Sequence, residues 1–139
     1  MKAISLWQPW AQAVVLGVKI LETRSWQTTH RGRVVIHAAA RLVPLHELGE
    51  DLRLWRRVFT ESPRMLPRGK LIGVVDVVQC VSAELVKPDP TNEAMGDFSA
   101  GRWAWELANA IPFQHPIDWR GRQRIFDVPD RVLPSWAVR

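Results

Sequence analysis

The chain has 139 residues, a length that suits one domain over residues 1–139 and a core that needs neither disulfide nor metal. Nineteen basic residues, fifteen of them Arg, against fourteen acidic ones leave a net charge of +5 and point toward anionic partners. A single Cys excludes an internal disulfide, no apolar run is long enough to span a membrane, and the N-terminus lacks a signal-peptide core, so we expect a cytoplasmic protein.

Short apolar and alternating segments predict a mainly β protein with helices inserted early. Strands are expected, in chain order, over residues 2–6, 20–26, 33–40, 70–82, 102–110 and 123–128. The run over 70–82 is almost wholly apolar and predicts a strand buried on both faces.

Two segments favour helices. In the first, Pro9 suits an opening turn and Gly17 a C-terminal cap. In the second, residues 44–59, apolar side chains recur at spacings of three and four. The stretches 60–69 and 83–101 read as loops, the latter with room for one helical turn. The expected fold is α+β, mainly β: a small, mostly antiparallel β-barrel with two to three helices flanking a cleft at one opening.

The strand over 20–26 carries an unusual group of side chains. Alternation places Ile20, Glu22, Arg24 and Trp26 on one face. One interpretation is a surface ion pair, worth about 0–1 kcal/mol. The other is a binding site in which Glu22 stays ionised, orients nearby cations and accepts a hydrogen bond from the exocyclic amine of a base.

Other aromatic and basic residues allow a structural and a functional interpretation side by side. Trp7 and Trp10 could cover the core or, with Gln8 between them, border a ligand at a helix start. Trp103 and Trp105 fit core packing equally well. His37 lies within a strand, where a core or cleft role is the commoner one. The arginine-rich turn over 119–124 is either a solvated loop or a phosphate contact.

The sequence predicts no cofactor and no metal. Three of the histidines, His30, His46 and His115, lack metal-ligand spacing, and one Cys cannot complete a zinc site. No glycine-rich phosphate loop or zinc-protease motif is present either. The oligomeric state stays open, with a monomer as the expectation.

Taken in order, these motifs resemble one known family, the ASCH (activating signal cointegrator homology) domain. The hallmark residues, from the Q-P-W-A segment through G-x-K-x-x-E-x-R-x-W and R-G to an I-H-A strand, are Gln8, Pro9, Trp10, Ala11, Gly17, Lys19, Glu22, Arg24, Trp26, Arg31, Gly32, Ile36, His37 and Ala38. Residues 71–81 resemble the central strand of the family, and the segment from Arg102 to Val128 resembles its closing strands.

The resemblance implies a PUA-like β-barrel with a basic cleft, and a part in binding RNA or DNA. Combined with the residue chemistry, it predicts a module for RNA, single-stranded DNA or a modified nucleoside. Lys19, Arg24 and Arg31 would contact phosphate, and one of the indoles would stack on a base. The predicted binding residues are Gln8, Trp10, Lys19, Glu22, Arg24, Trp26, Arg31, His37 and Trp105.

Some members of the family are enzymes, which gives a second hypothesis. One branch is similar to an amidohydrolase of N4-acetylcytidine that uses a Lys, a Thr and a Glu, and another member is described as a ribonuclease. Lys19 matches that lysine, whereas the threonine position is Glu22 here. A hydrolase would therefore depend on Lys19 and Glu22 as its catalytic residues.

Overall fold

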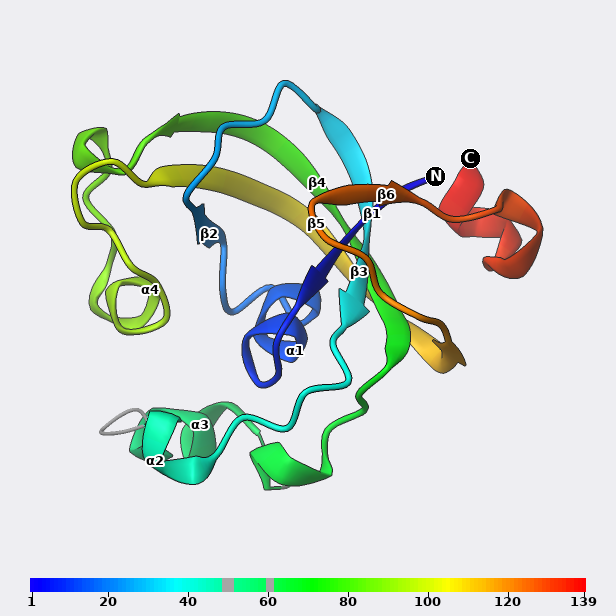
Figure 1. Cartoon of the computed structure of the whole chain (residues 1–139), viewed down its shortest axis with the longest axis horizontal. Helices are drawn as coiled ribbons and strands as arrows, with labels where there is room; N and C mark the ends of the chain where they lie inside the picture. The colour runs from blue at the N-terminus through cyan, green and yellow to red at the C-terminus, as the bar shows by residue number, and fades with distance from the viewer. Residues whose placement is uncertain (49–51, 60–61) are drawn as a thin grey trace.

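The computed structural model of the chain describes residues 1–48, 52–59 and 62–139. Within them, a six-stranded sheet in the order β2-β5-β4-β3-β1-β6 curls around helix α1 (Figure 1). The strands are β1 Lys2–Leu6, β2 Leu21–Arg24, β3 Gly32–Ala38, β4 Lys70–Ser82, β5 Trp103–Asp118 and β6 Ile125–Asp127. The helices are α1 Trp10–Val15, α2 Leu45–Leu48, α3 Leu52–Val58 and α4 Pro90–Ala94.

Every strand pair but one in this sheet is antiparallel, the exception being β1 with β3. The predicted mainly β, mostly antiparallel fold is therefore confirmed, as a curled open sheet. Strand β4 has the predicted bounds, and its first half, Leu71–Val75, is buried on both faces. The second half is not: Val78 is 55% exposed, so burial on both faces holds only in the first half, where Leu71 and Val74 pack in a second core cluster with Phe113, Phe126 and Leu133.

Strand β5 is longer than the sequence predicted. The expected strand ended at residue 110, with an extended stretch after it, but pairing with β4 continues to Asp118. Asn109 takes a positive φ of 54°, and the register shifts between Val74 and Asp76 on the partner strand. Such irregularities bend a strand and increase its twist, so β5 curls around the core rather than ending.

Helix α1 approaches the inner face of the sheet closely because Gly73 has no side chain. A Cβ at that position would lie 2.6 Å from the carbonyl oxygen of Ile111 and 2.8 Å from Cγ1 of Val15. The helix in turn buries Ala11, Val14 and Val15 against β1, β3 and β4 in the main core cluster. This packing fixes the start of α1, where Trp10 lies, relative to β2.

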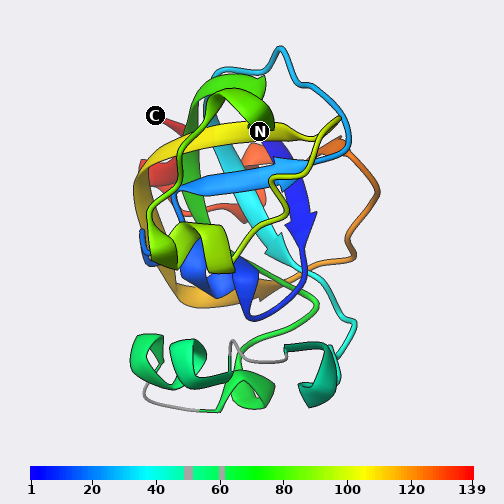
Figure 2. The same cartoon turned by 90° about the vertical axis from the view of Figure 1, so that its left-hand side faces the viewer.

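The segment over 44–59, which was expected to be helical, is helical at α2 and α3, and residues 49–51 lie outside the described part. These helices form a layer apart from the sheet, as Figure 2 shows. The two are joined to the rest by a cluster around Trp55 that includes Ala13 of α1 and Met95 next to α4. The predicted loop 60–69, of which 60–61 are not described, contains one 3-10 turn, Pro63–Met65. No helix among the described residues is long and apolar enough to cross a bilayer.

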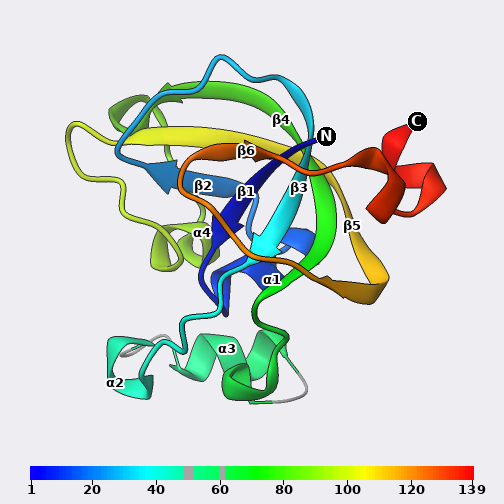
Figure 3. The ribbon, with the colours of Figure 1, turned by 45° about the vertical axis from the view of Figure 1, so that its right-hand side comes forward.

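The connection from β5 to β6 runs back across the sheet rather than turning tightly. Figure 3 shows this segment passing in front of β3 and β1 before it enters β6. It is attached there by a hydrogen bond of 2.8 Å between Nε2 of His37 and the carbonyl oxygen of Trp119. The arginines of residues 119–124 are thereby brought beside β1 and β2.

Candidate nucleic-acid interface

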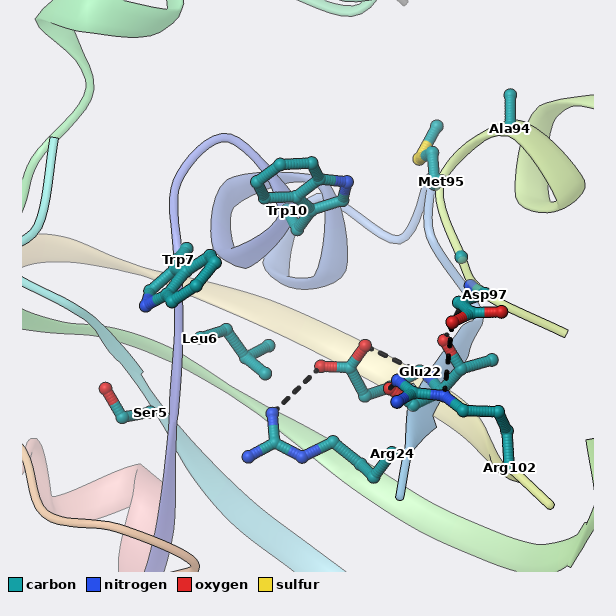
Figure 4. A pocket seen from close by; sticks show the side chains of 12 residues that line it. Ser5, Leu6, Trp7, Trp10, Glu22, Arg24, Ala94, Met95, Asp97 and Arg102 are labelled. Atoms are coloured by element: carbon teal, nitrogen blue, oxygen red, sulfur yellow. Dashed lines mark hydrogen bonds and ion pairs between the residues drawn. The ribbon is translucent and has the colours of Figure 1, made fainter. Parts of the chain in front are cut away.

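A hollow of about 560 Å³ opens between the start of α1, strand β2 and the segment that follows α4. We call it the polar hollow. Its lining consists of Ser5, Leu6, Trp7, Trp10, Glu22, Thr23, Arg24, Ala94, Met95, Gly96, Asp97 and Arg102. Figure 4 shows the two indoles on one side and Glu22 in the centre, with Arg24 reaching in from β2 and Arg102 from just before β5. The predicted pairing of Glu22 and Arg24 at one hollow is therefore what the structure shows.

The Glu22 carboxylate is fixed between two cations. Its Oε1 lies 3.3 Å from Nζ of Lys19 and accepts a hydrogen bond of 3.1 Å from the backbone N–H of Thr23. Its Oε2 lies 3.5 Å from a guanidinium nitrogen of Arg24. Glu22 is only 8% exposed, so these partners offset much of the cost of removing its charge from water. The remaining exposed edge faces the hollow as an oriented hydrogen-bond acceptor.

The position of Lys19 contradicts the prediction that this residue contacts phosphate. It is 1% exposed, does not line the hollow, and donates a hydrogen bond to the carbonyl oxygen of Leu21 as well as pairing with Glu22. An ammonium group enclosed in this way orients Glu22 from behind and does not reach a ligand. In the hydrolase hypothesis Lys19 would therefore act through Glu22, because it does not line the hollow itself.

The wall opposite the indoles comes from the segment before β5. Thr23 holds this segment: its hydroxyl oxygen accepts a hydrogen bond of 2.9 Å from the Asp97 N–H, and its carbonyl oxygen accepts one of 3.1 Å from Arg102. Hydrogen bonds from the side chain and backbone of Ser99 hold the pKa of Asp97 below its usual range. The hollow therefore contains two carboxylates, Glu22 and Asp97, and two guanidinium groups.

The tryptophans divide between the core and the surface. Trp105 is 1% exposed and packs edge-on against Trp26 at 4.9 Å between ring centroids, so the prediction that it stacks on a base is wrong. Trp10 borders the polar hollow, as predicted, and so does Trp7, which is 50% exposed. The sequence left Trp7 open between a core cover and a ligand contact, and its exposure makes it the better stacking candidate.

A second hollow, of about 760 Å³, adjoins the first and shares Ser5, Trp7 and Arg24 with it. We call it the arginine hollow. Its other lining residues are Trp26, His37, Ala39, Ala40, Gly69 and the loop Trp119, Arg120, Gly121, Arg122, Gln123 and Arg124. Guanidinium groups of Arg24 and Arg124 lie 5.6 Å and 4.3 Å from the Trp26 ring centroid, and such contacts preorganise both groups. Two predicted residues, Trp26 and His37, are thus at this hollow rather than at the polar one.

His37 links the loop to the sheet in a defined tautomer. Because the Trp119 carbonyl can only accept, Nε2 of His37 carries the proton, and Nδ1 accepts a hydrogen bond of 2.9 Å from the Ser5 hydroxyl. Burial lowers the pKa of His37 from 6.5, an effect that the hydrogen bond to the Trp119 backbone partly opposes. The imidazole is therefore neutral at pH 7.

This lowered pKa predicts an acid-sensitive stability. Unfolded His37 binds a proton as the pH falls through about 6.5, whereas the folded residue resists protonation. The contribution of neutral His37 to the free energy of unfolding is therefore complete above that pH and is lost below it. We expect the free energy of unfolding, from urea titrations at pH 7.5 and 5.5, to fall more in the wild type than in His37→Gln. Glutamine can keep both hydrogen bonds, which makes it the control; an equal fall in the two proteins would contradict the assignment.

Two further predicted residues lie outside both hollows. Gln8 is 3% exposed and is used structurally: its Oε1 accepts from the N–H of Gln12, and its Nε2 donates to the carbonyl oxygen of Pro67, both at 2.9 Å. The Arg31 side chain donates to two loop carbonyls and to Gln79 Oε1, at 3.0 Å. Neither is placed to read a base or bind a phosphate of a ligand held in these hollows.

Asp97 and Arg102 are site residues that sequence reasoning missed. They lie in and just after a segment expected to be loop, and they reach the hollow because β5 pairs with β2 in the register Thr23 with Ala104. A single sequence does not reveal that register. Trp7 did carry a signal, since an indole beside a predicted helix start was already a candidate for the hollow.

The fold matches solved structures of the same type. A crystal structure of an ASCH protein from Zymomonas mobilis superposes with a TM-score of 0.57 at 15% identity, covering 99% of this chain and 92% of that one. A variant of that protein gives 0.55 at 15% identity, with coverage of 92% and 89%. At this identity the likeness concerns the fold alone, and it agrees with the fold that the sequence predicted.

Sequence comparison places the chain more closely. The model of the ASCH domain matches residues 4–117. Activating signal cointegrator 1 of Homo sapiens is 40% identical over 101 residues, and that of Mus musculus is 38% identical. The matched part covers 68% of this chain but 17% of each relative. The chain belongs to the ASCH domain family.

Proposed function

We propose that this chain binds single-stranded nucleic acid, RNA in the first place, by taking a base or a modified nucleoside into the polar hollow. The observation that carries the proposal is the fixed Glu22–Arg24 pair, which presents an acceptor and a donor next to the indoles of Trp7 and Trp10 in one open hollow. Membership of the ASCH family, which is associated with nucleic-acid interaction, supports the same direction.

The chemistry of the hollow suits the polar edge of a nucleobase. A carboxylate accepts from an exocyclic amine, and a guanidinium donates to ring nitrogens and carbonyl oxygens. Trp7 and Trp10 offer flat surfaces, and a stacked base contributes about 1–3 kcal/mol. A volume of about 560 Å³ is within the usual range for small-ligand sites.

A single strand fits this arrangement better than a duplex. In an A-form duplex the base edges point into grooves that side chains read poorly, whereas unpaired bases can turn out and stack on aromatic rings. An isolated base in a hollow bordered by indoles requires such an unpaired nucleotide. RNA, single-stranded DNA and modified nucleosides share this requirement, and a ligand panel separates them.

We expect Arg24→Gln to weaken binding of a single-stranded oligonucleotide about tenfold, because a charge-assisted hydrogen bond to the ligand is lost. Fluorescence anisotropy against a panel of single-stranded RNA, single-stranded DNA, duplexes and nucleosides, at two salt concentrations, gives the measurement. Arg31→Gln removes the same charge outside the hollows and serves as the matched control. Equal affinity of the Arg24 variant and the wild type would contradict the proposal.

The same samples test the hydrolase hypothesis at no extra effort. Each is analysed after incubation for cleaved RNA and for cytidine released from N4-acetylcytidine. Product that the wild type forms and Glu22→Gln does not form would assign catalysis to the polar hollow. Substrate left unchanged by the wild type would leave binding as the role of the hollow.

A further inference from the structure

The charges of the two neighbouring hollows differ sharply. The polar hollow is balanced, with Glu22 and Asp97 against Arg24 and Arg102. The arginine hollow has four guanidinium groups, those of Arg24, Arg120, Arg122 and Arg124, and none of the described residues that line it is acidic. An anionic group would meet two carboxylates in the first hollow and only cations in the second.

The loop arginines are available to a ligand. Arg120, Arg122 and Arg124 are exposed, and no described carboxylate lies within ion-pair distance of them. The acids nearest along the chain, Asp118 and Asp127, are already paired with Lys70 and Lys2 respectively. Unpaired guanidinium groups around one hollow are suited to bidentate hydrogen bonds with phosphate oxygens.

The backbone of the loop is seated in a way that only glycine permits. A Cβ at Gly121 would lie 2.6 Å from Cε1 and 2.7 Å from Nδ1 of His37, and 3.0 Å from Oγ of Ser5. The ring of His37 also holds the loop through the carbonyl of Trp119. The loop therefore rests directly on the Ser5–His37 pair, and this contact sets the positions of the arginines on either side of Gly121.

We propose that the arginine hollow is a phosphate subsite and that one ligand spans both hollows, with its base in the polar hollow and its phosphate against Arg120 and Arg122. The inference rests on the proposed function and narrows it: the ligand class is a nucleotide or a strand, not a free nucleoside. Ser5, Trp7 and Arg24 form the shared wall, so the two groups of a single nucleotide are within reach of both hollows.

Calorimetry with four probes tests this proposal: inorganic phosphate, a nucleoside, its monophosphate and a short single-stranded oligonucleotide. In the wild type we expect the monophosphate to bind at least tenfold more tightly than the nucleoside. In the double variant R120Q/R122Q the monophosphate should fall to the affinity of the nucleoside, which itself should not change. For the oligonucleotide, the salt slope should decrease by about 0.7 for each lost phosphate contact.

Two variants make the test specific. R131Q/R139Q removes the same charge at exposed positions outside both hollows. This variant should still bind the monophosphate more tightly than the nucleoside, as the wild type does. Gly121→Ala removes no charge; it should displace the loop and reduce the gain while the melting temperature shows that the protein is folded.

The outcomes separate the two proposals. Equal affinity of nucleoside and monophosphate, or equal losses for both in R120Q/R122Q, would overturn the phosphate subsite while leaving the proposed function standing. Arginine-dependent binding of inorganic phosphate, with no gain from an attached base, would overturn the ligand that spans both hollows. A wild type that binds no oligonucleotide at low salt would overturn the proposed function itself.

Discussion

Lys19→Met is expected to lower the free energy of unfolding by about 3 kcal/mol. Breaking a buried ion pair from one side costs about 3–5 kcal/mol, because the other charge stays in a poorly solvated site. The lower end of this range applies here, since Glu22 keeps Arg24 at 3.5 Å and the Thr23 N–H at 3.1 Å. The carbonyl of Leu21 also loses its donor. Urea denaturation at pH 7 measures the loss.

The control for this prediction removes both charges. K19M/E22Q removes both charges of the Lys19–Glu22 pair, so no carboxylate is left buried without its lysine. The double variant should therefore recover part of the stability that Lys19→Met loses, because the effects of two contacting residues are not additive. Arg24→Gln should cost only about 0–1 kcal/mol, because its side chain is 22% exposed and solvent screens the pair. If Lys19→Met kept full stability but reduced the salt slope of nucleic-acid binding, the lysine would reach the ligand after all.

Trp55→Ala is expected to destabilise the protein by about 3–5 kcal/mol, the usual cost of truncating a fully buried tryptophan. Trp55 is 0% exposed and lies between Phe59, stacked at 5.8 Å, and Trp10, edge-on at 6.0 Å. Trp10 and Met95 belong both to this cluster and to the lining of the polar hollow. The cavity that the truncated Trp55 side chain leaves should therefore also make the positions of Trp10 and Met95 at the polar hollow less well defined. We therefore expect oligonucleotide affinity to fall in this variant even at temperatures where it is fully folded.

Trp55→Phe separates ring packing from the indole N–H. The Nε1 group of Trp55 is buried and has no hydrogen-bond partner among the described residues, so replacing it costs packing volume but removes an unsatisfied donor. A loss of about 1 kcal/mol or less and unchanged affinity are expected. Thermal melts measure the stability and anisotropy titrations measure the oligonucleotide affinity. If Trp55→Phe lost as much of both as Trp55→Ala, an aromatic ring at this position would not be enough to support the lining of the polar hollow.

Local patterns predicted the strands well where burial alternates or is continuous. Strand β4 has the expected ends because the apolar and β-branched residues that favour a strand begin and end with residues 70–82 themselves. The face shared by Glu22 and Arg24 was likewise predictable, since side chains two apart in a strand point the same way. The resemblance to a family then supplied the barrel, which periodicity suggested only in outline.

What the sequence could not give depends on contacts between distant segments. Lys19 was expected at the ligand, but its burial results from the way the segment before β2 packs against α4, where Asn92 Oδ1 accepts from the N–H of Ile20 at 2.9 Å. Trp105 was a candidate both for the core and for stacking on a base, and its pairing with Glu22 places it inside the curl. Charge and aromaticity indicate what a residue can bind, whereas register decides whether it faces solvent.

Arg24 borders both hollows, and this shared position has a thermodynamic consequence. Its guanidinium now pairs with Glu22, so a group that draws it toward one side withdraws it from the other. Occupancy on the two sides is then linked, and linkage requires each occupant to change the affinity of the other by the same factor. The domain would in this way favour, or reject, two chemical groups as a pair through the position of one side chain.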